Sequence, residues 1–250
     1  MQYSRRLPLK GLKNARDLGG FAVPGGVTRF GVFIRSEIPS DLPADDIAML
    51  RDYGVRTAVD LRGAAELELK PDVLRYEDFI KYIHIPMADR IAAQGADRKL
   101  VQPVDDTFRW GTHYISMCEH QREWAKRVLT AMAEEPGAVL FHCTTGKDRA
   151  GISTALILGL CGADDMDIAA DYCVSEIYLK TFYESMNSFV PDGYRQEKYH
   201  PEFFSTAHAN MFMLLEHFNK QYGGIRGYVD SCGVGEDIVR AIRDRLVNIS

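Results

Sequence analysis

The stretch that decides the fold is Ala138-Val139-Leu140-Phe141-His142-Cys143-Thr144-Thr145-Gly146-Lys147-Asp148-Arg149-Ala150-Gly151. Pro136-Gly137 ends the helical pattern before it, and the four apolar residues 138–141 predict a short buried strand that runs directly into His142 and Cys143. A glycine-containing loop follows and opens into an apolar helix that extends to Leu160. The order strand, loop, helix therefore places Cys143 at the carboxyl end of a strand.

Strand and helix patterns alternate outward from this unit. Strands are predicted at 31–34, 55–61 and 79–85, and helices at 43–54, 107–118 and 121–133. From Asp164 onward the pattern predicts only helices, at 166–183, 201–222, 225–231 and 235–247. This alternation predicts an α/β fold with a mainly parallel central sheet flanked by helices. We expect one domain over residues 1–250, with a helical C-terminal cap over residues 164–231.

Composition and charge exclude several classes of protein. The net charge of -5 and the pI near 5.8 make a nucleic-acid partner unexpected, because nucleic-acid modules carry clustered positive charge. No apolar stretch follows Arg5 and Arg6, so neither a signal nor a transit peptide is predicted and a cytoplasmic location is expected. The apolar run Ala150–Ala163 is shorter than the roughly 20 residues that cross a bilayer, so no membrane span is expected.

The spacing of Cys143 and Arg149 predicts an anion-binding loop. The two side chains can lie on opposite sides of one phosphate, while loop N–H groups and the positive end of the helix dipole point at the same anion. This field favours the thiolate of Cys143, whose in-line attack on phosphorus would form a phosphocysteine that water then hydrolyses. The other loop residues expected to bind the substrate are Thr144, Thr145, Gly146, Lys147, Ala150 and Gly151.

The leaving oxygen of a phosphate ester needs a proton, since even a tyrosine hydroxyl has a pKa of about 10. Asp148 lies within the loop and is the favoured acid. Asp60, at the end of another predicted strand, and Asp89, in a loop, are the alternatives.

The run HCTTGKDRAG resembles the signature of cysteine-dependent protein tyrosine and dual-specificity phosphatases. Further segments resemble the bacterial and fungal branch that contains the secreted mycobacterial phosphatase and its Listeria counterpart. These segments are Asn14-Ala15-Arg16-Asp17-Leu18-Gly19-Gly20, Arg35-Ser36, Asp60-Leu61-Arg62 with Glu66, Ala170-Asp171-Tyr172 and Tyr222-Gly223-Gly224-Ile225-Arg226-Gly227-Tyr228. The resemblance implies a phosphotyrosine substrate, sometimes phosphoserine or phosphothreonine and often phosphoinositides, with inorganic phosphate as product and no cofactor. It also implies that the Lys147 ammonium adds charge for a multiply phosphorylated headgroup.

Ala150 departs from the family pattern, which has threonine or serine after the loop arginine. The missing hydroxyl predicts slow hydrolysis of the phosphocysteine unless Thr144, Thr145 or Ser153 replaces it. An inactive phosphate-binding module is therefore one alternative. An arsenate reductase or a sulfurtransferase, which also use a cysteine in an anion loop, is another.

The remaining polar residues have two interpretations each. Asn14, Arg16, Asp17, Arg35 and Arg62 could contact substrate or form a buried ion-pair scaffold that holds the loop. His142 could tune the thiolate or simply pack, and Asp60 could pair with an arginine. The histidines and the other cysteines lack metal-ligand spacing, so no metal is predicted. The aromatic stretch 178–204 predicts core packing or a lid over the site.

Overall fold

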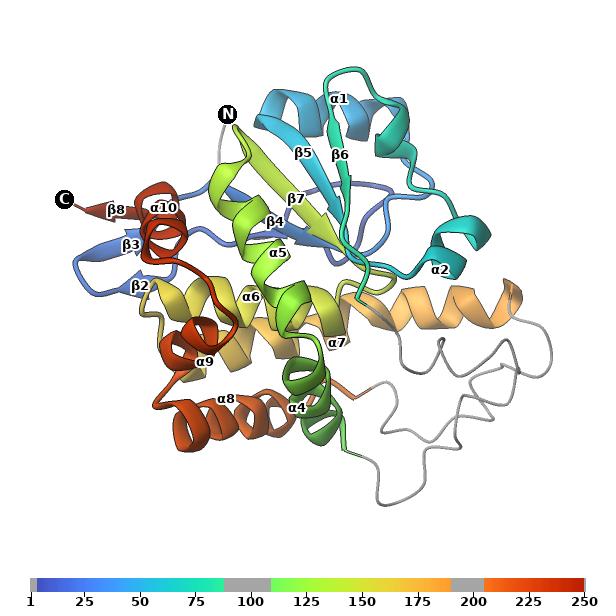
Figure 1. Cartoon of the computed structure of the whole chain (residues 1–250). Helices are drawn as coiled ribbons and strands as arrows, with labels where there is room; N and C mark the ends of the chain where they lie inside the picture. Colours follow the sequence, from blue (N-terminus) through green and yellow to red (C-terminus); the bar gives the residue numbers. More distant parts are fainter. Residues whose placement is uncertain (1–3, 88–108, 190–204, 250) are drawn as a thin grey trace.

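The computed structural model of the chain describes residues 4–87, 109–189 and 205–249. Its larger sheet has the strand order β1-β4-β7-β5-β6, in which β1 is antiparallel to β4 and the other neighbours are parallel. The strands are β1 (Arg16–Asp17), β4 (Phe33–Ser36), β5 (Val55–Asp60), β6 (Lys81–His84) and β7 (Ala138–His142). The predicted α/β fold with a mainly parallel sheet is confirmed, with β7 at its centre (Figure 1).

The strand register brings three strand ends together. His142, the last residue of β7, is level with Ser36 of β4 and with Asp60 of β5. The backbone N–H of Leu61 donates to the His142 carbonyl at 2.9 Å, so the ladder continues to the point where the chain leaves the sheet. Cys143 therefore emerges at the shared carboxyl edge of the sheet, where sites form in parallel α/β proteins.

Strand β7 buries a different hydrophobic cluster on each face. Ala138 and Leu140 join the smaller cluster, which also contains residues of α1 (Ala44–Tyr53). Val139 and Phe141 join the larger cluster on the opposite face. Alternate side chains of a strand point to opposite faces, so an apolar run such as 138–141 is what a strand covered on both sides requires.

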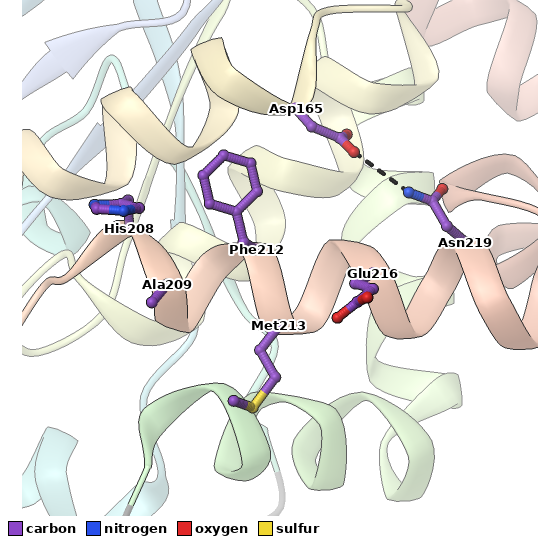
Figure 2. Close-up of a pocket in the computed structure, with 7 residues that line it drawn as sticks. All are labelled: Asp165, His208, Ala209, Phe212, Met213, Glu216 and Asn219. Atoms are coloured by element: carbon purple, nitrogen blue, oxygen red, sulfur yellow. Dashed lines mark hydrogen bonds between the residues drawn. The ribbon is translucent and has the colours of Figure 1, made fainter.

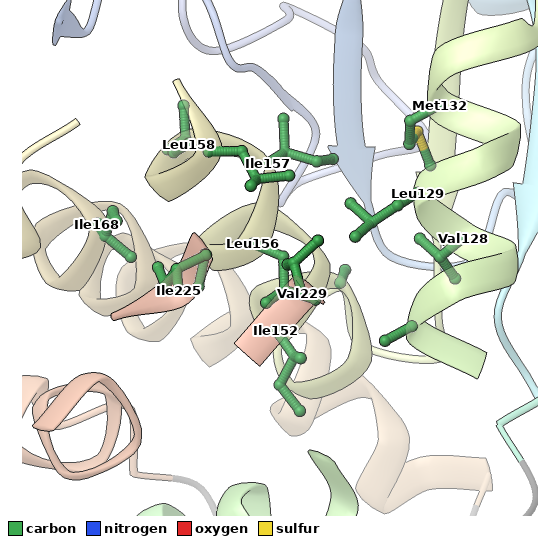
Figure 3. Close-up of a cluster of buried hydrophobic side chains, with 14 of the residues drawn as sticks. Val128, Leu129, Met132, Ile152, Leu156, Ile157, Leu158, Ile168, Ile225 and Val229 are labelled. Carbon is green, nitrogen blue, oxygen red and sulfur yellow. The ribbon is translucent and has the colours of Figure 1, made fainter. Parts of the chain in front are cut away.

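The larger cluster is built around α6, in which almost every side chain is buried (Figure 3). A helix that is apolar all round must be covered on all sides. Helices α5, α7, α9 and α10 all contact α6. The helices of this layer are α4 (Trp110–His120), α5 (Arg122–Glu134), α6 (Asp148–Leu160), α7 (Asp165–Phe189), α8 (His208–Tyr222), α9 (Ile225–Ser231) and α10 (Glu236–Leu246).

The prediction of an all-helical chain after Asp164 is wrong at its end. Strand β8 (Val247–Ile249) pairs antiparallel with β3 (Gly26–Thr28), which forms a hairpin with β2 (Ala22–Val23). This second, three-stranded sheet joins the two ends of the chain (Figure 1). A three-residue strand has too few positions to show a period, and its partner lies at the other end of the sequence.

Two short elements between β5 and β6 were also not predicted, namely α2 (Ala64–Leu69) and the 3-10 helix η1 (Val73–Tyr76). Parts of the predicted helices at 107–118 and 201–222, and residues 190–204 of the aromatic stretch, lie outside the described residues. The assignment of residues 1–250 to one domain stays a prediction. Across the described ranges, no helix is both long enough and apolar enough to cross a membrane.

Candidate active site

The loop 143–147 connects the end of β7 to the first turn of α6 and is tightly packed. The Cys143 side chain is buried. Gly146 has a φ of +69°, in the left-handed region, and a Cβ built on it would lie 2.5 Å from the carbonyl carbon of Ser36. Because only glycine combines this conformation with this close approach, Gly146 fixes the path of the loop against β4.

Carbonyl groups of the loop are bound from outside by buried side chains. Asn14 Nδ2 donates to the Thr145 carbonyl at 3.0 Å, and Arg35 Nη2 donates to the Gly146 carbonyl at 2.7 Å. In a trans peptide the N–H points away from the C=O, so the amide that follows each bound carbonyl faces the opposite side. The Thr145 contact therefore leaves the Gly146 N–H free to face the inner side of the loop, whereas the Lys147 N–H donates to the Thr145 hydroxyl oxygen at 3.3 Å.

Asp171 of α7 anchors this scaffold. Its carboxylate accepts hydrogen bonds from Arg16 Nε at 2.8 Å, Arg35 Nη1 at 2.6 Å and Arg5 Nη2 at 2.9 Å. Burial opposes ionisation of Asp171, but the charges of Arg16 and Arg35 outweigh it and hold its pKa well below the ordinary range. Burial together with Arg16 lowers the pKa of Arg35 to about 10. Arg16 and Arg35 are therefore engaged in the scaffold in this structure.

Asp17 also belongs to the scaffold. Its carboxylate accepts from the N–H groups of Gly19 and Gly31, each at 2.7 Å, and from the Tyr53 hydroxyl at 2.8 Å. Burial raises its pKa to about 6, although these hydrogen bonds oppose the shift. The contacts join the turn after β1 to the turn before β4 and to the end of α1.

Arg149 is held by Glu66, a residue whose role sequence reasoning missed. Arg149 Nη1 and Nη2 donate to the two carboxylate oxygens of Glu66 at 2.5 Å and 2.8 Å, and the Thr144 hydroxyl donates to the same carboxylate. Burial raises the pKa of Glu66, but the hydrogen bonds and the charge of Arg149 outweigh it and lower that pKa to about 2. The only sequence signal for this role of Glu66 was its place beside the Asp60-Leu61-Arg62 segment in the family resemblance.

Asp148 begins α6 and accepts a hydrogen bond from the first of two tyrosines whose hydroxyls are themselves hydrogen-bonded. The Tyr114 hydroxyl of α4 donates to Asp148 Oδ1 at 2.6 Å, and the Tyr172 hydroxyl of α7 lies 2.7 Å from the Tyr114 hydroxyl. Lys147 Nζ lies 3.4 Å from the same Asp148 oxygen. The favoured acid thus sits where the loop meets two helices.

Lys147 is buried rather than presented to solvent. Its ammonium lies 4.0 Å from the centroid of the Trp110 ring and 3.4 Å from the Ser205 carbonyl oxygen. This cation–π contact directs the charge toward α4.

Asp60 and His142 lie beneath the loop in a buried polar group. Arg62 Nη2 donates to Asp60 at 2.6 Å, and the Tyr82 hydroxyl donates to it at 2.7 Å. Burial opposes ionisation, but the hydrogen bonds of Arg62 and the His142 charge lower the pKa of Asp60 to about 2. Both Asp60 oxygens are engaged by buried partners, so the geometry favours the supporting role. Asp89 lies outside the described residues.

His142 Nε2 lies 2.9 Å from Asp72 Oδ2, and Asp60, Asp72 and His142 place possible metal-ligating atoms within 4.8 Å of one another. All three residues are fully buried. Hydrogen bonds to Arg62, Tyr82 and one another already use atoms of this group. The expectation of no metal remains a prediction.

Ala150 and Gly151 lie in the first turn of α6, where space is limited. Ala150 is fully buried, and a Cβ on Gly151 would lie 3.3 Å from the Tyr172 ring. The Ser153 hydroxyl, one turn further on, donates to the Arg149 carbonyl at 2.9 Å. The proton of the Ser153 hydroxyl is therefore already used in a hydrogen bond and cannot replace the hydroxyl that Ala150 lacks. The Ser153 oxygen can still accept a hydrogen bond.

A separate surface hollow lies on α8 and the start of α7 (Figure 2). Phe212 and Met213 line it, and Asn219 Nδ2 donates to Asp165 Oδ2 at 3.3 Å across one end. No residue of the Cys143 loop lines this hollow. It does not contribute to the site described here.

The Cys143 loop lies at the carboxyl edge of a mainly parallel sheet, and comparison with known proteins identifies the family to which the chain belongs. The family model described as "Tyrosine phosphatase family" matches residues 7–248. The chain belongs to this tyrosine phosphatase family, as the resemblance implied, and the prediction of a phosphatase enzyme is confirmed.

Two sequence relatives agree with this assignment. A tyrosine-protein phosphatase of Nostoc commune is 30% identical, with 86% of this chain and 74% of that protein covered. The triple specificity protein phosphatase PtpB of Mycobacterium tuberculosis is 25% identical, with 97% of this chain and 99% of that protein covered. The solved structure of P. aeruginosa TpbA is 15% identical at a TM-score of 0.36, covering 86% of this chain and 96% of that one.

Proposed function

We propose that this chain hydrolyses phosphate monoesters, with phosphotyrosine as the leading substrate, through a phosphocysteine on Cys143. The observation that carries the proposal is the loop itself. Cys143 and Arg149 flank one short loop, and buried Asn14 and Arg35 bind its carbonyls from outside. A prearranged loop stabilises the charge of the transition state without reorganising during the reaction.

In the first step the Cys143 thiolate attacks phosphorus in line with the leaving group. The S–P bond forms as the P–O bond to the leaving group breaks, and Asp148 transfers its proton to the departing oxygen. Arg149 and the loop N–H groups bind the equatorial phosphate oxygens. The products of this step are phosphocysteine, the free alcohol or phenol, and an ionised Asp148.

In the second step water attacks the phosphocysteine. Asp148 accepts a proton from the water, the O–P bond forms as the S–P bond breaks, and the Cys143 thiolate leaves with inorganic phosphate as product. Ala150 offers no hydroxyl to assist this thiolate. We therefore expect the second step to be slower than the first.

The substrate range follows from what Lys147 can reach. The family resemblance makes phosphoserine, phosphothreonine and phosphoinositides further candidate substrates, and the M. tuberculosis relative is named a triple specificity protein phosphatase. Lys147, however, is engaged with Trp110 and Asp148. A substrate with a single phosphate needs no further cation, so this geometry favours phosphotyrosine over a multiply phosphorylated headgroup.

The rival functions make different predictions for the same assay. An arsenate reductase or a sulfurtransferase would need an oxyanion or sulfane substrate and would release no phosphate from phosphotyrosine. An inactive phosphate-binding module is suggested by the missing hydroxyl at Ala150. Such a module would bind phosphate but would not hydrolyse the phosphotyrosine peptide.

The test compares wild type with Cys143→Ser on a phosphotyrosine peptide, with a phosphoserine peptide and a phosphoinositide in parallel, and release of inorganic phosphate as readout. Cys161→Ser is the matched control, because Cys161 is equally buried at the other end of α6. We expect activity in wild type and the control, none in Cys143→Ser, and a phosphorylated Cys143 peptide after acid quenching. Wild type without phosphate release, or an active Cys143→Ser, would reject the proposal.

A further inference from the structure

Tyr114 is a buried residue that no sequence motif singled out, and its hydroxyl touches the acid. The ring of Tyr114 is fully buried on α4, and its hydroxyl is 2.6 Å from Asp148 Oδ1. Tyr172 is also fully buried, and its hydroxyl is 2.7 Å from that of Tyr114. The two rings meet edge to face at 5.9 Å, which fixes both hydroxyls in place.

The direction of these hydrogen bonds follows from the donors available. An ionised carboxylate can only accept, so the single proton of Tyr114 is directed to Asp148. Tyr172 must then donate to the Tyr114 oxygen. Burial and the nearby Asp148 charge raise the pKa of Tyr114 well above its ordinary value, so the Tyr114 hydroxyl keeps its proton and remains a donor.

The contacts of Asp148 fall on one oxygen. Tyr114 donates a hydrogen bond to Oδ1, and the Lys147 ammonium forms an ion pair with the same oxygen. Within the described ranges no hydrogen bond or ion pair is found for Oδ2. A carboxylic acid that accepts at Oδ1 carries its proton on Oδ2. The oxygen that bears the transferable proton is therefore selected by Tyr114, which lies outside the loop, together with Lys147 of the loop.

We infer that Tyr114, braced by Tyr172, is the positioning residue for proton transfer by Asp148. The inference rests on the proposed function, in which Asp148 is the acid. Tyr114 itself touches neither substrate nor phosphorus in this scheme. It fixes the carboxyl so that Oδ2 can face the leaving oxygen, and it couples the acid to helices α4 and α7.

The effect of Tyr114→Phe should depend on the leaving group. General acid catalysis contributes about 10²–10⁴-fold, and a weakly basic leaving group needs it least. We expect kcat/KM for phenyl phosphate to fall about tenfold or more, and kcat/KM for p-nitrophenyl phosphate to fall less than about threefold. The ratio kcat/KM is the suitable quantity because it reports the first irreversible step, whatever the rate of phosphocysteine hydrolysis.

The pH profile provides a second readout. The titratable groups facing Asp148 are Lys147 from the loop, Tyr114 from α4 and, through Tyr114, Tyr172 from α7. Removing the Tyr114 donor destabilises the carboxylate, so the alkaline limb of kcat/KM should move to higher pH. A purely structural role would lower the whole profile without moving that limb.

Three further variants complete the test. Tyr228→Phe is the matched control, since its equally buried hydroxyl donates to the Cys118 carbonyl at 2.8 Å, and it should leave both substrates unchanged. Tyr172→Phe removes the hydrogen bond to the Tyr114 hydroxyl and should give a smaller loss with the same preference for the good leaving group. In the Asp148→Asn background, Tyr114→Phe should add no further loss for phenyl phosphate.

Equal losses for both substrates with an unmoved alkaline limb, in Tyr114→Phe and Tyr172→Phe alike, would overturn the inference. An Asp148→Asn variant that does not discriminate between leaving groups would overturn it too, while leaving the Cys143 phosphatase intact. Failure of the proposed function itself would be recognised separately, by wild type that releases no phosphate.

Discussion

The carboxylate of Glu66 holds the guanidinium of Arg149 in a bidentate pair, with hydrogen bonds of 2.5 Å and 2.8 Å. Glu66 also accepts the Thr144 hydroxyl, so one side chain fixes both ends of the loop. We predict that Glu66→Gln lowers kcat/KM by about tenfold to a hundredfold, because a misplacement of 1 Å can cost about 10²-fold. Steady-state kinetics measure this. Glu68→Gln, an exposed glutamate of the same helix, should behave as wild type.

The same pair makes stability depend on pH. The pKa of Glu66 is about 2 in the folded protein, below its ordinary value of 4.5. A depressed carboxyl pKa contributes stability above the unfolded value, and that contribution is lost as the pH falls through the folded value. Urea unfolding should therefore show the destabilisation by Glu66→Gln fully at about pH 6 and less at about pH 3. A difference that grows on acidification would contradict the ion pair.

Asp171 is the common counter-charge of the scaffold. Asp171→Asn would leave the buried Arg16 and Arg35 without their carboxylate, so we predict a loss of about 3–5 kcal/mol in the free energy of unfolding. Phosphatase activity should fall with it, because Arg35 also binds the Gly146 carbonyl. Asp45→Asn removes one partner of an exposed pair with Lys10 and should change the stability little. Urea titration of both variants tests the contrast.

Alanine substitutions at Gly146 and Gly25 distinguish the effect of a steric clash from the effect of backbone strain. Both have positive φ, but a Cβ on Gly146 would strike Ser36, whereas a Cβ on Gly25 has nothing within 4 Å. Gly25→Ala should cost only the strain of about 1–2 kcal/mol and keep full activity. Gly146→Ala should abolish phosphate release, because Ser36 belongs to the sheet and cannot yield. An active Gly146→Ala would show that the loop path is less tightly fixed than its packing indicates.

Ala150 should make phosphocysteine hydrolysis slow. Rapid mixing with p-nitrophenyl phosphate is expected to give a burst of p-nitrophenol followed by a slower steady rate. Ala150→Ser adds the missing hydroxyl with one extra atom and should reduce the burst while raising the steady rate. A wild type without a burst, or an Ala150→Ser variant with the same burst, would contradict this role of position 150.

The centre of the fold could be predicted because its signals are local. The apolar run 138–141, the turn at Gly146 and the apolar helix after Arg149 are adjacent in sequence, and each has a recognisable period or punctuation. The same local signals located β4 and β5. Strand β8 could not be found in this way, because only its pairing with β3 makes it a strand.

The partners of the site residues were harder to predict, for the same physical reason. Glu66 precedes Arg149 by 83 positions, and Tyr114 precedes Asp148 by 34. Such pairs are brought together only by the tertiary fold, and a single sequence has no period that records them. The burial of Lys147 against Trp110 is another contact of this kind, since the loop motif alone predicted only that Lys147 binds the substrate.

The dependence of the loop on Asp171 has a consequence for synthesis of the protein. A growing chain releases residues 142–151 before Asp171, so every residue of the motif exists while Arg16 and Arg35 still lack their counter-charge. The nascent protein should therefore have no phosphatase activity until α7 packs against α6 and Asp171 binds Arg16 and Arg35. A fragment that ends before Asp171 would carry the full signature and yet release no phosphate.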